Sequence, residues 1–168
     1  AVDLASLINL DYHLQEAAVA RLRESGKKTR LFINMMPRIL SSVFTDIVVD
    51  PFKMHLINLV HKYDIEPNMI VVEITEDEFA GDIARLVAIV ETFKKHGFQI
   101  AVDDVGSGMS DLSRIAYIMP DIIKVDLQLL QRSVTQVGFR QVLQAVSYLS
   151  HRIGASLLFE GIEQEEEL

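Results

Sequence analysis

The sequence predicts an α/β fold of the TIM-type (β/α)8 barrel class, with about five βα units in its 168 residues. Short apolar runs rich in branched residues alternate with longer stretches of helical periodicity, an alternation typical of βα units around a parallel sheet. The runs are apolar along their whole length, which indicates strands buried on both faces. Each run ends in a polar residue, and in parallel α/β folds the carboxyl ends of the strands form the face that carries the chemistry.

Five strands and four helices are predicted along the chain. The strands are expected over residues 30–34, 69–73, 99–103, 121–124 and 156–160. The helices are expected over residues 4–25, 51–63, 82–96 and 133–153. Glycines follow three of these helices and suit the left-handed backbone of a helix end, and Pro51 suits the first turn of the second helix. No linker or low-complexity segment interrupts the series, so residues 1–168 are expected to form one domain.

The composition narrows the ligands and partners that the chain is expected to have. Its 24 acidic and 16 basic side chains give a formal charge of −8, which argues against binding to a long nucleic acid. A small phosphate ligand is compatible with this charge if metal cations lie between its phosphates and the carboxylates. The lack of cysteine leaves oxygen and imidazole ligands and favours Mg²⁺ or Mn²⁺. No signal peptide or membrane-spanning run is seen, so a cytoplasmic location is expected.

Polar residues at the strand ends define a candidate site: Asn34, Glu73, Asp103 with Asp104, Lys124 with Asp126, and Glu160. Because parallel strands bring their carboxyl ends to one face, these side chains are expected to meet in one place. Carboxylates and an amide are good ligands for hard divalent cations. Two such cations can activate a water for in-line attack on a phosphodiester, and a neighbouring lysine can orient that water.

Several of these residues also have a purely structural interpretation. Asp103 and Asp104 could end a strand and cap a helix, and Asp126 could cap the helical turn that follows it. Lys124 could extend its ammonium group to solvent, although it lies between apolar residues of a buried strand. Glu163 could belong to a solvated helix start. The histidines show no ligand spacing and are interpreted as structural: His13, His55, His61, His96 and His151.

Five stretches of the chain carry a resemblance to a known family. FINMMP, VVEITE, AVDDVGSGMSDL, PDIIKVD and FEGIE resemble five successive motifs of EAL domains, in the order that the family has them. Active EAL domains are barrels that hydrolyse the bacterial second messenger cyclic di-GMP to linear pGpG with two divalent cations. The resemblance therefore implies a signal-terminating phosphodiesterase. The alternative is a catalytically inactive EAL domain that acts as a cyclic di-GMP receptor or a protein-interaction module.

The resemblance also implies a metal-ligand set. Asn34, Glu73 and Asp103 match the residues that hold a first cation in the family. Asp103 bridges to a second cation, Mg²⁺ or Mn²⁺, that Asp104 and Glu160 help to hold.

Other matched positions imply catalytic and supporting roles. Lys124 matches the lysine that orients the attacking water, and it forms the expected catalytic group with Glu160 and Asp104. Asp126 and Glu163 match positions linked to substrate contact.

The loop over residues 105–112 is expected to matter for the site and for assembly. The resemblance implies that Glu76 supports this loop, and Gly106 and Gly108 allow it to turn tightly. The family uses the loop near its dimer contact, so a homodimer through the loop after Asp104 is possible. A sensor or GGDEF domain outside this chain is possible too.

The chain also departs from the family's pattern. The glutamate that gives the family its name and a glutamine near the last strand are missing, so the chain is expected to be an internal portion that lacks the first strands and the last strand. The 168-residue chain alone is therefore expected to be inactive. Met36, Val105 and Phe159 stand where the family usually has a serine, a phenylalanine and a small residue.

Overall fold

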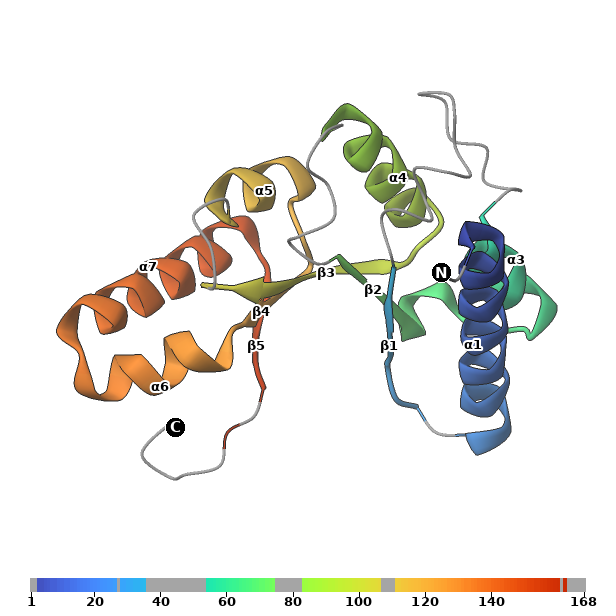
Figure 1. Cartoon of the computed structure of the whole chain (residues 1–168), viewed down its shortest axis with the longest axis horizontal. Coiled ribbons are helices and arrows are strands. Elements are labelled where there is room, and N and C mark those ends of the chain that lie inside the picture. Colours follow the sequence, from blue (N-terminus) through green and yellow to red (C-terminus); the bar gives the residue numbers. More distant parts are fainter. Residues whose placement is uncertain are drawn as a thin grey trace. The chain divides into compact units, whose positions relative to one another are not determined.

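The computed structural model describes residues 3–26, 28–35, 54–74, 83–106, 111–160 and 162. In these ranges five strands alternate with helices (Figure 1), and the strands follow one another in chain order across a sheet, β1-β2-β3-β4-β5. The register-paired neighbours β1 and β2, β3 and β4, and β4 and β5 run parallel. The predicted alternation and parallel sheet are confirmed. No helix in the described ranges has the length and apolar character that crossing a bilayer needs.

The chain forms two compact units, and the first comprises Ala1–Glu73 and Glu78–Ile100. Its elements are α1 (Leu4–Ser25), β1 (Leu31–Asn34), α3 (His55–Lys62), the 3-10 turn η2 (Pro67–Met69), β2 (Ile70–Ile74) and α4 (Ile83–Lys95). The Asp3 carboxylate begins α1 by accepting a 2.8 Å hydrogen bond from the Ser6 amide. Gly26 ends α1 in the left-handed conformation, with φ 59°. The prediction for this helix is confirmed at both ends.

The remaining helices of the first unit lie inside their predicted ranges. The helix predicted over residues 51–63 is α3, although residues 51–53, with Pro51, lie outside the described residues. The helix predicted over residues 82–96 is α4, which buries Leu86, Ile89, Val90 and Phe93. Every residue of β2 is buried, so this strand belongs to the core.

The second unit comprises Ile74–Asp77 and Ala101–Leu168. It holds most of β3 (Gln99–Val105), followed by α5 (Asp111–Ile118), β4 (Ile122–Val125), α6 (Leu127–Thr135), α7 (Val137–Ile153) and β5 (Ser156–Phe159). The prediction of one helix over residues 133–153 is wrong, because Gln136 is extended, with φ −113° and ψ 116°, and separates α6 from α7. The Arg140 guanidinium donates to the carbonyl oxygens of Ser133 (3.0 Å) and Val134 (2.7 Å). It thereby satisfies acceptors that the end of α6 leaves open.

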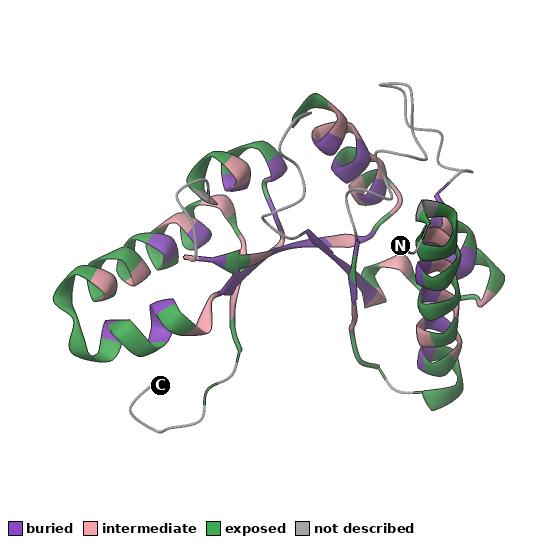
Figure 2. Cartoon of the chain, in the orientation of Figure 1, coloured by how far each residue is buried: buried purple, intermediate pink, exposed green. Residues whose placement is uncertain are grey.

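The prediction that all five strands are buried on both faces is correct for the middle of the sheet and wrong for its edges. Buried residues, purple in Figure 2, fill β2 and β4 and most of β3. In β5, Ser156 and Phe159 are exposed, and in β1 only Ile33 is buried. The reason is position, since β1 and β5 are the first and last strands of the described sheet and each pairs on one side only.

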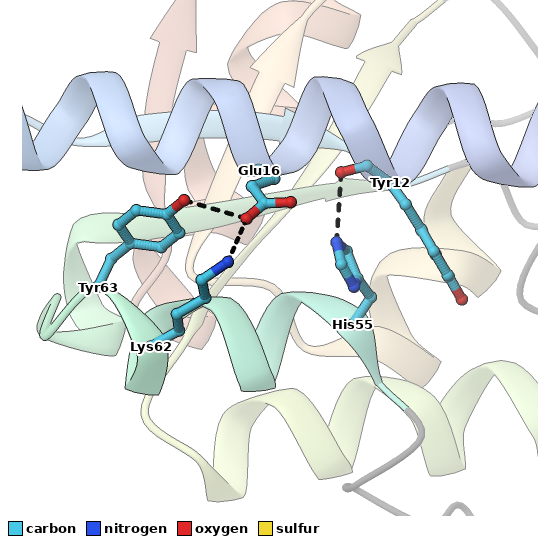
Figure 3. A network of polar contacts seen from close by, with 5 residues as sticks. All are labelled: Tyr12, Glu16, His55, Lys62 and Tyr63. Atoms are coloured by element: carbon cyan, nitrogen blue, oxygen red, sulfur yellow. Dashed lines mark hydrogen bonds and ion pairs between the residues drawn. The ribbon is translucent and has the colours of Figure 1, made fainter.

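A polar network joins α1 to α3 (Figure 3). The Glu16 carboxylate accepts hydrogen bonds from the Lys62 ammonium group and, at 3.0 Å, from the Tyr63 hydroxyl group. The rings of Tyr12 and His55 stack with their centroids 4.2 Å apart, and His55 Nε2 lies 3.2 Å from the Tyr12 carbonyl oxygen. These contacts lower the pKa of Glu16, first through the hydrogen bond from Lys62, and raise the pKa of Lys62.

The Glu16–Lys62 contact predicts a pH-dependent contribution to stability. The folded state lowers the pKa of Glu16 from its ordinary 4.5. The stability that its carboxylate adds is therefore present above pH 4.5 and is lost as the pH falls through the folded-state pKa. We expect Glu16→Gln to unfold at a lower urea concentration than the wild type at pH 7, with the difference shrinking below pH 4.5. An equal difference at pH 3 and pH 7 would contradict this.

Candidate functional site

In the first unit, two predicted ligands stand side by side at strand ends. Asn34 is the last residue of β1 and lies opposite Glu73 of β2 in the parallel register. The Met35 amide extends this pairing by donating to the Glu73 carbonyl oxygen at 3.0 Å. The Glu73 side chain is buried, at 9% exposure, whereas Asn34 is exposed. An amide and a carboxylate are thus presented together at the carboxyl ends of two neighbouring strands.

In the second unit, Lys124 of β4 is the centre of an ion-pair cluster. Its residue is only 5% exposed and lies between the buried Ile123 and Val125. The Lys124 Nζ atom donates to Asp103 Oδ2 at 2.9 Å and lies 3.1 Å from Glu160 Oε1. A buried ammonium group needs such compensation, because its removal from water is costly. Three successive strands of the sheet, β3, β4 and β5, thus bring two acids and one amine together.

A backbone irregularity allows the neighbouring Asp104 to join this cluster. Consecutive side chains of a regular strand point to opposite faces. The register between β3 and β4 shifts between Val102 and Val105, and Asp104 has a left-handed φ of 57°. Burial raises the pKa of Asp104, and the negative charges of Asp103, Asp126 and Glu160 raise it further against the opposing charge of Lys124. The cluster therefore has an excess of negative charge.

Asp126 follows β4 and begins α6. Its Oδ1 atom accepts hydrogen bonds from the backbone amides of Gln128 (2.7 Å) and Leu129 (3.2 Å). Its own amide donates to the Val105 carbonyl oxygen at 3.0 Å and so ties the ends of β3 and β4 together. The interpretation of Asp126 as a helix cap is confirmed, and its contact with substrate stays a prediction.

The two roles of Asp126 can be separated by substitution. Asp126→Ala removes the cap and is expected to lower the free energy of unfolding by about 1 kcal/mol. Asp126→Asn keeps a capping oxygen and removes the charge, so the stability should change little. Urea unfolding of both variants checks this expectation. Equal losses in the two variants would show that the charge, not the cap, carries the stability.

Gly106 brings the end of β3 against α6. Its φ is +110°, and a Cβ atom at this position would lie 2.4 Å from Leu129 Cδ2. Gly106 thus packs closely against α6 next to the aspartate pair, and its role in supporting the site stays a prediction. Gly108, Glu76, Glu163 and Met36 lie outside the described residues.

The residues predicted to form one metal centre come from both units. Asn34 and Glu73 belong to the first, and Asp103, Asp104 and Glu160 to the second, so their union around metal ions stays a prediction. Within the described ranges, no three Asp, Glu or His side chains are grouped so that they could hold a metal ion. Lys124 lies between two of the expected ligands and supplies positive charge there. The donor set of hard oxygens and its excess negative charge fit a divalent cation.

Sequence reasoning missed a buried polar pair in α1. Asp11 and Gln15 are 8% and 3% exposed, and the Gln15 side chain reaches Met35, the residue after Asn34. A signal for them is present in the sequence, because they share a helical stripe with Val19 and Leu22.

Parallel strands that carry acids and a lysine at their carboxyl ends are typical of the TIM-barrel class of protein. The sequence matches the family described as the EAL domain over residues 1–168, and the chain belongs to this family. EAL domains are TIM-like barrels, so the predicted fold class and the family resemblance are confirmed.

Relatives of known structure or function support this assignment. YkuI, an EAL-domain protein of Bacillus subtilis (strain 168), is 34% identical over 164 residues, which are 96% of this chain and 38% of YkuI. RocR, a cyclic di-GMP phosphodiesterase of Pseudomonas aeruginosa, is 26% identical over 147 residues, 88% of this chain and 36% of RocR. The chain thus spans well under half of the length of either relative.

Two of the similar solved structures contain the nucleotide. A standalone EAL protein from Vibrio cholerae O395 with cyclic di-GMP bound has a TM-score of 0.83 at 27% identity, covering 99% of this chain and 68% of that one. The structure of Bacillus subtilis YkuI, in complex with cyclic di-GMP and calcium, has a TM-score of 0.81 at 32% identity, covering 99% of this chain and 40% of that one.

Proposed function

We propose that the protein containing this chain hydrolyses one phosphodiester bond of cyclic di-GMP and releases linear pGpG. The observation that carries the proposal is the Lys124 ammonium group, buried in β4 and paired with Asp103 and Glu160. A buried lysine between acids at strand ends is expensive for a fold to keep. It suits a reaction that needs an oriented water and negatively charged ligands. We choose cyclic di-GMP as the substrate because RocR is a cyclic di-GMP phosphodiesterase and two similar EAL structures have this nucleotide bound.

The chain's own residues divide the work in this proposal. Lys124 orients the attacking water and moves a proton at its Nζ atom, together with Glu160 and Asp104 as the other catalytic residues. Asp103 holds the ammonium group in position through the 2.9 Å hydrogen bond. Asp126 contacts the substrate in addition to capping α6, and Glu163 is assigned the same role.

Divalent cations complete the proposed site. Asn34, Glu73, Asp103, Asp104 and Glu160 would hold Mg²⁺ or Mn²⁺, because they provide the oxygen donors that these cations prefer. When bound, a pair of such ions supplies Lewis acidity toward the phosphodiester and the attacking water. The YkuI structure contains calcium as well as cyclic di-GMP, which supports the binding of a divalent cation by the proposed site.

Product analysis tests the proposal. The intact protein is incubated with cyclic di-GMP and Mn²⁺ or Mg²⁺, and the products are separated by chromatography. We expect pGpG to form only with the metal and to disappear with a chelator. The variant Asp104→Asn should lose most of this turnover while it stays folded. Binding of cyclic di-GMP without any pGpG would instead favour the inactive receptor.

The 168-residue chain by itself is expected to bind metal weakly and to turn nothing over. This expectation rests on the glutamate that gives the family its name, which is missing from the chain, because losing one anionic ligand from a shared set weakens metal binding. The same product assay on the chain alone checks it. Formation of pGpG by the chain with magnesium would contradict the idea that the domain is incomplete.

A homodimer through the loop after Asp104, and a sensor or GGDEF domain, are further partners that we propose.

A further inference from the structure

A polar pair in α1 lies where apolar residues are expected. The described side chains of α1 that are buried form one stripe along the helix: Asp11, Gln15, Val19 and Leu22. The leucines directly before the two polar residues are exposed, Leu10 by 57% and Leu14 by 61%. The helix thus buries a carboxylate and an amide and leaves two leucines in solvent. Hydrophobic burial favours the reverse arrangement.

The pair satisfies itself only in part. Gln15 Nε2 donates to Asp11 Oδ2 at 2.8 Å. Among the described residues, Gln15 Oε1 has no hydrogen-bond partner. Burial raises the pKa of Asp11, against the opposing charge of His55 and the hydrogen bond from Gln15. Burying groups with incomplete compensation costs free energy, so stability alone does not explain why they are inside. Departures of this kind are expected at positions that serve a functional site.

The pair reaches the end of β1. Gln15 Nε2 lies 3.6 Å from Met35 Sδ, and Met35 is 6% exposed. Met35 directly follows Asn34, and its amide donates to the Glu73 carbonyl oxygen at 3.0 Å. This hydrogen bond continues the pairing of β1 with β2 by one residue, and neighbouring side chains of extended backbone point to opposite sides, so a shift of Met35 is expected to change the direction of Asn34. Contacts of Met35 on the buried side of the chain are therefore placed to influence the direction of the exposed Asn34 amide.

We propose that Asp11 and Gln15 are positioning residues that hold Met35, and through it Asn34, in the direction that metal binding needs. This inference rests on the proposed function, in which Asn34 is a metal ligand. Residues that orient a ligand from behind typically change metal affinity by about 10–100-fold when they are replaced. The pair then accounts for polar groups that hydrophobic packing would exclude.

Mn²⁺ titration of the intact protein by calorimetry tests the inference. Gln15→Met keeps an unbranched side chain but removes the donor, and we expect it to weaken Mn²⁺ binding about tenfold or more. Its urea unfolding midpoint should equal or exceed that of the wild type, and the ¹³C-methyl resonance of Met35 should move. Asp11→Leu removes the acceptor for Gln15 and should weaken Mn²⁺ binding. Asp11→Asn keeps an acceptor and should bind Mn²⁺ with near-normal affinity. The matched control is Leu14→Gln, on the exposed neighbouring position, which should leave Mn²⁺ binding unchanged.

A substitution of the proposed metal ligand Asn34 separates this inference from the proposed function. If Asn34→Ala weakens Mn²⁺ binding and Gln15→Met stays within about twofold of the wild type, the positioning role is overturned. If Asn34→Ala has no effect, the metal assignment fails instead. The side-chain amide resonance of Asn34 then decides, since a shift in Gln15→Met supports the positioning role and no shift overturns it. Loss of folding in both Gln15→Met and Gln15→Leu would reveal a purely stabilising role and also overturn it.

Discussion

Lys124→Met is expected to reduce the turnover of cyclic di-GMP by at least about 100-fold, the usual contribution of a positioned proton-transfer group. The ammonium group is 2.9 Å from Asp103 Oδ2 and 3.1 Å from Glu160 Oε1, and no other described ammonium or guanidinium group is paired with either acid in the structure. Removing it leaves Asp103 without its cationic partner and, within the described residues, with only the hydrogen bond from the Asp104 amide, at 2.9 Å. We expect the free energy of unfolding to fall by about 1–3 kcal/mol, less than for a fully buried pair, because Glu160 is 57% exposed.

Two controls distinguish chemistry from stability at Lys124. The double variant Lys124→Met with Asp103→Asn removes both charges, so it should regain stability but no turnover. Lys62→Met removes an exposed lysine that also pairs with a carboxylate, that of Glu16, and should change turnover little. Chromatographic assay of pGpG and urea unfolding measure the two effects. Turnover by Lys124→Met within about tenfold of the wild type would exclude Lys124 as a catalytic residue.

Gly106→Ala is expected to destabilise the protein by about 2–4 kcal/mol, because left-handed strain and overpacking add together. The new Cβ atom would lie 2.4 Å from Leu129 Cδ2 and 2.9 Å from Leu129 Cβ, and Leu129 is 2% exposed. Relief of this clash requires β3 and α6 to separate. Since Asp104 and Asp126 lie at the ends of these two elements, turnover should fall along with stability.

The chain offers a matched glycine for comparison. Gly138 in α7 has ordinary backbone, and nothing lies within 4 Å of an added Cβ atom, so Gly138→Ala should raise the free energy of unfolding by about 0.5 kcal/mol. Combining Gly106→Ala with Leu129→Ala tests the cause. The two losses should sum to more than the loss of the double variant, because one change makes room for the other. Strict additivity in urea unfolding would show that the close approach to Leu129 is not responsible.

Much of the fold follows from the sequence, because the strands and most helices have strong local patterns. All five strands begin and end within two residues of their predicted bounds, and α1 matches at both ends. The break at Gln136 was not predicted, since one extended residue leaves the apolar periodicity on either side intact. The short helix α5 was not predicted either, because a loop was expected up to residue 112 and only a few buried residues, such as Ile115 and Ile118, mark it.

Residues of the candidate site could be predicted where a polar side chain stands at the end of an apolar strand. Lys124, Asp103 and Glu160 were each placed at a strand end, and the structure brings these three together. The backbone irregularity at Asp104 and the polar pair in α1 were not predictable. The first depends on how β3 pairs with β4, and the second reverses the hydrophobic pattern that such predictions use.

At Asp104, thermal stability and the proposed reaction favour different residues, because the left-handed backbone costs stability whereas the reaction needs the carboxylate. An L-residue with a Cβ atom at φ 57° costs roughly 1–2 kcal/mol that glycine avoids, and asparagine tolerates this conformation without bringing another negative charge. Laboratory evolution that rewards only heat resistance should therefore favour Gly or Asn at position 104. Thermostabilised variants obtained in that way would retain the barrel and lose a carboxylate from its mouth, so selection needs a catalytic readout alongside.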